Sequence, residues 1–124
     1  MATTFKIELG GSRKGTVSPM TIVYYDEEFS TTQKDADFLE DYMQLAYSME
    51  QKGVINAIKL FKILWACEKT YKQGTMENFH AWVKMLPNAS LSNRNDYEEL
   101  AGAIQSEFFP DSKSQESTQE IKED

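Results

Sequence analysis

The sequence predicts an α+β protein that is mainly α, with an N-terminal β-hairpin packed on a small bundle of about four helices and a disordered acidic C-terminal tail. Two observations predict this class. Apolar residues recur with a period of two near the N-terminus and with helical spacing after about residue 30. Beyond Pro110 the composition becomes polar and acidic. We therefore expect one globular domain over residues 1–110 and a disordered tail over residues 111–124.

The segment 54–67 is an apolar run that predicts the central helix of the domain. Its apolar residues recur at i, i+3, i+4 and i+7 from several starting points, which predicts an unusually wide apolar stripe. Lysine side chains lie on the narrow polar strip that remains, where their stems can cover apolar surface. The run is too short and too charged for a membrane span. The polar strip consists of Asn56, Lys59, Lys62 and Lys69.

The N-terminal residues 3–25 predict the β-hairpin. Residues 4–9 alternate between apolar and polar, residues 10–15 are rich in glycine, and residues 16–25 are rich in β-branched and aromatic side chains. Pro19 lacks an N–H group, so we expect it at an edge, at a bulge or where pairing begins. The glycine-rich turn does not predict a phosphate-binding loop, because Lys14 precedes the last glycine and a strand follows.

Four helices are predicted at residues 33–51, 54–72, 76–86 and 96–109. Each is bounded by residues that begin or end helices. The expected N-caps are Thr31 or Thr32, Thr75, and Asn95 or Asp96; the expected C-terminal glycine is Gly53; and the expected stops are Pro87 and Pro110.

The composition argues against several classes of protein. A net charge of −7 argues against a nucleic-acid binder, because binding to phosphates needs clustered Lys and Arg. The N-terminus has charges where a secretion signal needs an uninterrupted apolar segment. The single cysteine, Cys67, lies in the central apolar run, where a free thiol behaves as a small hydrophobe. We therefore expect a cytosolic protein that binds neither nucleic acid nor membrane.

No pattern in the sequence predicts catalytic residues, metal ligands or a cofactor. The acidic residues of segments 26–28 and 35–41 resemble a metal site or a carboxylate pair, but they lack a nearby His or Cys. A solvated acidic face at the beginning of a helix is the favoured interpretation. His80 is the only histidine and has no second candidate ligand close in sequence. An enzyme with a site that the sequence does not reveal remains a separate hypothesis.

Several segments, in order, resemble the tail assembly chaperones of long-tailed phages and prophages, particularly the small ones from phages of Gram-positive hosts. They are Thr-Thr-Phe-Lys-Ile-Glu-Leu in the first strand, Asp-Phe-Leu-Glu-Asp-Tyr-Met at 37–43, Ile-Leu-Trp-Ala at 63–66 and Phe-His-Ala-Trp-Val at 79–83. The resemblance covers most of residues 3–109. It implies a non-enzymatic protein of the host cytoplasm that binds the helical tape-measure protein, keeps it soluble and helps tail-tube subunits polymerise. The acidic tail has no counterpart in the family pattern.

Aromatic residues are more numerous than a few helices easily bury, so each is either core or part of a groove for an amphipathic partner helix. The last two helices are short and carry more large apolar residues than one stripe can cover. We predict a partner-binding surface at Phe79, Trp82, Met85 and Phe108, hidden in a homo-oligomer until a partner arrives. An acidic helical adaptor or regulatory protein that masks a partner protein is the alternative function.

Overall fold

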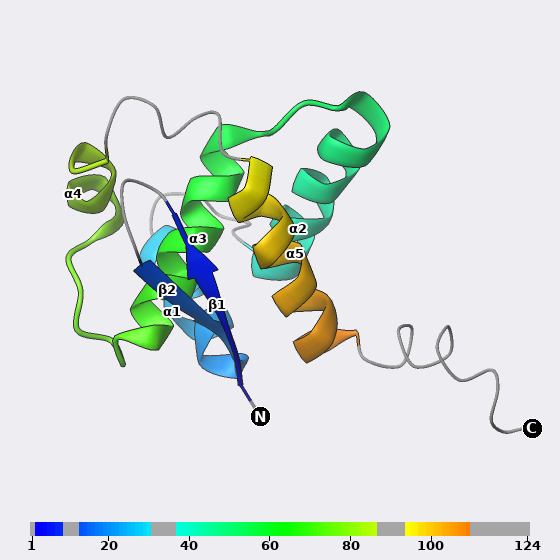
Figure 1. Ribbon diagram of the computed structural model, residues 1–124. Coiled ribbons are helices and arrows are strands. Elements are labelled where there is room, and N and C mark those ends of the chain that lie inside the picture. The colour runs from blue at the N-terminus through cyan, green and yellow to red at the C-terminus, as the bar shows by residue number, and fades with distance from the viewer. Residues whose placement is uncertain (1, 9–12, 31–36, 87–93, 110–124) are drawn as a thin grey trace, which may run out of the picture.

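The computed structural model describes residues 2–8, 13–30, 37–86 and 94–109, and within these it confirms a mainly α protein with an N-terminal hairpin (Figure 1). The division into a domain and an acidic tail stays a prediction, since residues 110–124 lie outside the described residues. The described elements are β1 (Thr3–Ile7), β2 (Arg13–Val17), α1 (Pro19–Phe29), α2 (Phe38–Tyr47), a π-helical turn η1 (Ser48–Lys52), α3 (Ala57–Tyr71), α4 (Phe79–Lys84) and α5 (Arg94–Phe108).

The hairpin lies on α3 through β2 and beside α5 through β1 (Figure 1). The two strands are antiparallel, with Phe5 opposite Gly15, and the inward residues Phe5, Ile7 and Val17 are buried. Gly15 is needed for this packing, because a Cβ atom at its position would lie 2.9 Å from the Cβ atom of Cys67 on α3. The missing side chain lets strand and helix approach closely.

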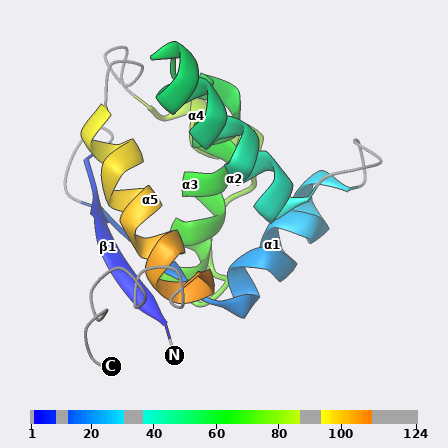
Figure 2. The ribbon, with the colours of Figure 1, turned by 90° about the vertical axis from the view of Figure 1, so that its right-hand side faces the viewer.

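Helix α3 is the centre of the fold, as the apolar run predicts. Its residues from Ile63 to Glu68 are all buried, and β2, α1, α2 and α4 pack around it (Figures 1 and 2). Burial raises the pKa of the Cys67 thiol, in agreement with its predicted role as a small core residue. The predicted start at residue 54 is wrong. The helix begins at Ala57, because the side chain of Asn56 accepts a hydrogen bond from the Lys59 backbone N–H.

The predicted second strand over residues 16–25 is wrong beyond Val17, because α1 begins at Pro19. Ser18 is the N-cap: its hydroxyl accepts from the Met20 N–H at 3.2 Å, while its own N–H donates to the Thr21 hydroxyl at 3.1 Å. Pro19 is favourable in the first helical turn, where its missing N–H would have no partner within the helix. Pro19 therefore begins a helix instead of marking a strand edge or a bulge.

Three predicted helix starts also differ from the structure, and for α2 and α4 the reason is a side chain that caps the helix at another position. Helix α2 begins at Phe38 and not at residue 33, since Asp37 accepts from the Glu40 N–H. Helix α4 begins at Phe79 with Asn78 as its N-cap, so Thr75 is not the cap. Helix α5 begins at Arg94, before both predicted caps. Thr31, Thr32, Pro87 and Pro110 lie outside the described residues.

The predicted C-terminal glycine, Gly53, is confirmed. It follows η1 in the left-handed conformation, with φ at 68°, and its N–H donates to the Met49 carbonyl. Asp96, which was predicted as an N-cap, instead lies buried in the first turn of α5. Its carboxylate accepts from the Glu8 N–H at 2.8 Å and so ties α5 to the end of β1. Desolvation by burial raises the pKa of this carboxyl.

Candidate partner-binding groove

The structure does not bring the four predicted partner-binding residues together. Trp82 is completely buried, Phe79 packs against the rings of Phe29 and Trp65, and Phe108 packs against Phe38. Met85 is 58% exposed. Helix α4 and the C-terminal end of α5 lie on different sides of the molecule (Figure 1). The four residues therefore form no common surface, and most of their apolar area belongs to the core.

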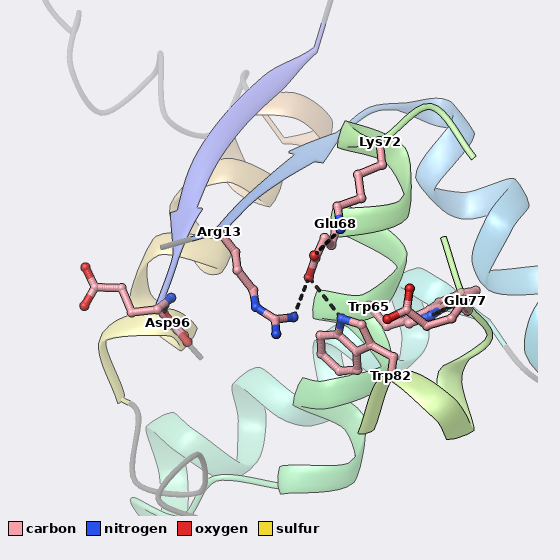
Figure 3. A network of polar contacts seen from close by, with 8 residues as sticks. Arg13, Trp65, Glu68, Lys72, Glu77, Trp82 and Asp96 are labelled. Atoms are coloured by element: carbon pink, nitrogen blue, oxygen red, sulfur yellow. Dashed lines mark hydrogen bonds and ion pairs between the residues drawn. The ribbon is translucent and has the colours of Figure 1, made fainter. Parts of the chain in front are cut away.

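A buried carboxylate explains why Trp82 points inward. Glu68 Oε1 accepts from Trp82 Nε1 at 3.0 Å and from Arg13 Nη1 at 3.1 Å, and Glu68 Oε2 lies 3.2 Å from Lys72 Nζ (Figure 3). The indole N–H therefore has a partner inside the protein, and the whole ring can be buried. The Arg13 guanidinium lies 5.9 Å from the centre of the same ring. These contacts tie β2, α3 and α4 together.

A cavity of about 410 Å³ adjoins this cluster, and its walls are polar and apolar in about equal parts. It is lined by Arg13, Lys14, Glu68, Tyr71, Lys72, Glu77 and Met85. Both Glu68 oxygens already accept from cations or from the indole N–H. The geometry therefore favours a structural role for Glu68 over proton transfer to a bound molecule.

A second buried carboxylate corrects the prediction of a solvated acidic face. Asp41 is buried and accepts a hydrogen bond from the Tyr25 hydroxyl, and its Oδ1 lies 3.5 Å from Lys59 Nζ. Burial and the neighbouring Asp41 raise the pKa of Tyr25. Glu28 accepts from the Phe79 backbone N–H at 2.9 Å and helps to hold the start of α4. These two acids therefore stabilise contacts between helices.

The part of the chain that the structure describes contains no cluster of three or more His, Cys, Asp or Glu side chains that could hold a metal ion. His80 is exposed on α4.

A groove lies between α2 with η1 and the C-terminal end of α5, and the two helices run in roughly opposite directions (Figure 2). The two helices touch at one end of the groove, where the Phe38 and Phe108 rings lie 6.2 Å apart and Gln105 Nε2 donates to the Tyr42 hydroxyl at 3.3 Å. From this contact the groove continues along α2 toward η1, with a volume of about 390 Å³. It is lined by Tyr42, Met43, Ala46, Tyr47, Glu50, Gln51, Gln105 and Phe109.

The walls of the groove are more apolar than polar, and an acidic side chain lies at one end. Met43 and Tyr47, one helical turn apart, are each 60% exposed, and Ala46 between them contributes only a methyl group. Burial raises the pKa of the Tyr42 hydroxyl, whereas the hydrogen bond from Gln105 lowers it. Glu50 is exposed at the η1 end. Within the described residues, the groove is therefore an exposed and mostly apolar surface of the kind that can bind a partner.

The local sequence explains why this face of α2 stays open. The inward residues Phe38, Tyr42, Leu45 and Met49 are buried at helical spacing, and Met43 and Tyr47 lie on the neighbouring face. The left-handed Gly53 ends η1, and the chain then leads into α3. Sequence reasoning missed the groove although the signal was present: α2 carries more large apolar residues than one stripe buries.

Comparisons with known proteins give no family: no protein-family model, no curated protein and no solved structure matches this chain. Within the described residues, no helix is both long enough and apolar enough to cross a membrane.

Proposed function

We propose that this chain is a non-enzymatic tail assembly chaperone of long-tailed phages or prophages, which acts in the host cytoplasm. It binds amphipathic helical segments of the tape-measure protein, keeps that protein soluble and assists polymerisation of tail-tube subunits. The observation that supports this proposal best is the uncovered groove between α2 and α5, with Met43 and Tyr47 exposed along it. The resemblance of segments 37–43 and 79–83 to this family supports it independently.

The groove has the chemistry that recognition of a helix needs. Amphipathic helices bind through apolar side chains at i, i+3, i+4 and i+7, which insert into an elongated apolar groove. An unbranched methionine adapts to differently shaped partners, and an exposed aromatic ring supplies a rigid anchor. Such adaptability suits a chaperone that binds many similar segments along one long partner.

Co-expression with fragments of a tape-measure protein tests the proposal. The wild-type chain should raise the soluble yield of at least one fragment and co-purify with it. Met43→Glu should reduce the affinity at least about tenfold, because a carboxylate would have to be buried against apolar side chains. Met85→Glu is the matched control, since both methionines are about equally exposed and Met85 lies directly after α4, away from the groove lining.

The outcomes separate this proposal from its alternative. If no fragment gains solubility or co-purifies, the chain is not a tape-measure chaperone. An adaptor that masks a different partner would still bind that partner through the groove, with the same sensitivity to Met43→Glu. Loss of fragment binding in Met85→Glu, with Met43→Glu unaffected, would move the site to α4.

A further inference from the structure

Among the described residues, the one charged side chain that lines the α2–α5 groove is acidic, and it lies at the η1 end, where Lys52 is also present. Glu50 lines this end, and the C-terminus of a helix adds partial negative charge from its carbonyl groups. The other polar residues of the lining, Gln51 and Gln105, are neutral. The whole chain has a net charge of −7, so the field around the groove also attracts cations.

One ring of the groove already faces a cation of the same chain. The ammonium group of Lys52 lies 6.0 Å from the centre of the Tyr47 ring, at the outer limit of a cation–π contact. Tyr47 lines the groove and is 60% exposed, so a partner can reach it. A lysine or arginine of a bound helix could therefore replace Lys52 at this ring.

Two occupants from this chain itself fit the groove poorly. A second copy placed groove to groove would bring two chains of net charge −7 together, with Glu50 on both sides. The segment 111–124 has five acidic residues, two lysines and Ile121 as its one strongly apolar residue, so it lacks an apolar stripe and carries the wrong charge. A basic partner suits the groove better than either.

We propose that the groove selects an amphipathic helix with Lys or Arg beside its apolar stripe, and that Lys52 occupies the cation position at Tyr47 until the partner displaces it. This inference rests on the proposed function, because it names the chemistry of the helix that the chaperone binds. The apolar stripe contacts Met43, Ala46 and Phe109, and the cation contacts Tyr47 and lies close to Glu50. Lys52 therefore acts as an internal competitor for the partner's charge.

Designed peptides test the inference on the full chain. Three helical peptides of about 18 residues share one apolar stripe and carry Lys, Gln or Glu beside it, and calorimetry measures their affinities. The Lys peptide should bind at least about fivefold more tightly than the Gln peptide, and the Glu peptide most weakly. Added salt should reduce the difference between the peptides.

Variants at Lys52 and at Tyr47 give a second test. Lys52→Met should tighten binding of the Lys peptide about two- to threefold and leave the Gln peptide unchanged, since only a cation competes with Lys52. Tyr47→Leu should retain binding of the Gln peptide but reduce the preference for Lys, because it keeps apolar area and removes the aromatic face. Circular dichroism of each variant confirms that it is folded.

Three results would overturn the inference. They are equal affinities for the three peptides, a Lys52→Met variant that weakens all of them, and a wild-type dimer that Met43→Glu dissociates. The peptides are not tape-measure sequences, so the two proposals can fail separately. Selective binding of the Lys peptide without binding of any tape-measure fragment removes the proposed function alone. Binding of tape-measure fragments with an affinity that does not depend on their Lys and Arg content would overturn this inference alone.

Discussion

Two exposed methionines, Met85 directly after α4 and Met43 on α2, have almost the same accessibility but lie in different surroundings. On the α4 side both tryptophans are buried, because Glu68 provides a hydrogen-bond acceptor for the Trp82 indole and Trp65 Nε1 donates to the Glu77 carbonyl at 3.0 Å. Around Met43 the exposed ring of Tyr47 lines an open groove. The difference teaches that internal polar partners decide whether an aromatic residue becomes core or surface.

The largest expected effect on the free energy of unfolding is at Trp65 in the core. Trp65→Ala should destabilise the fold by about 3–5 kcal/mol, because Trp65 is completely buried and contacts the rings of Phe29 and Phe79. Urea unfolding measures this difference. Tyr47→Ala, on the groove side, is the control and should change the free energy of unfolding much less. Equal losses in both variants would contradict the contrast between the two sides.

The next effect concerns the acceptor that holds Trp82 inside. Glu68→Ala should destabilise the fold by about 2–4 kcal/mol, since it leaves the Trp82 indole and the partly buried Arg13 without their partner. Amide exchange should become faster in α4, which the cluster attaches to α3. A variant that unfolds like the wild type, with unchanged exchange in α4, would show that Glu68 does not anchor Trp82.

A smaller loss is expected where β2 meets α3. Gly15→Ala should destabilise by about 1–3 kcal/mol, because the added Cβ would also lie only 3.0–3.1 Å from the side chains of Ile7 and Phe5. Thermal unfolding followed by circular dichroism measures the loss. No change in the melting temperature would mean that β2 can move away from α3 without cost.

The sequence predicted those parts of the fold in which local pattern and burial agree. The apolar run 54–67 predicted the central helix, and the alternation at Phe5 and Ile7 predicted β1, because one periodicity dominates in each. The segment 16–25 failed because β-branched and aromatic residues favour a strand, whereas Ser18 and Pro19 begin a helix. The Ser-Pro pair, with Thr21 three residues after Ser18, was the signal that could have corrected it.

The binding surface was harder to predict because it depends on contacts between distant segments. Tryptophan is a residue type that is common at interfaces. In this fold, however, Trp82 donates to Glu68, which also binds Arg13 from a distant part of the chain, so Trp82 is buried in the core. Met43 and Tyr47 resemble ordinary residues of an amphipathic helix, and their spacing does not show that Gln105 and Phe109 complete a groove beside them. Spacing within one helix cannot show which of its faces another helix will cover.

The smallest expected effect is a gain in stability at a second glycine, Gly102. Gly102 lies inside α5 on an exposed face, and apart from its chain neighbours and the backbone of α5 no atom of the described residues lies within 4 Å of the position that a Cβ atom would take. Gly102→Ala should therefore stabilise the fold by about 0.5–1 kcal/mol, because alanine loses less backbone entropy in a helix. The melting temperature should rise in Gly102→Ala and fall in Gly15→Ala, although the chemical change is the same. A loss of stability in Gly102→Ala would show that the outer face of α5 is covered in solution, and light scattering would then reveal a second copy on that face.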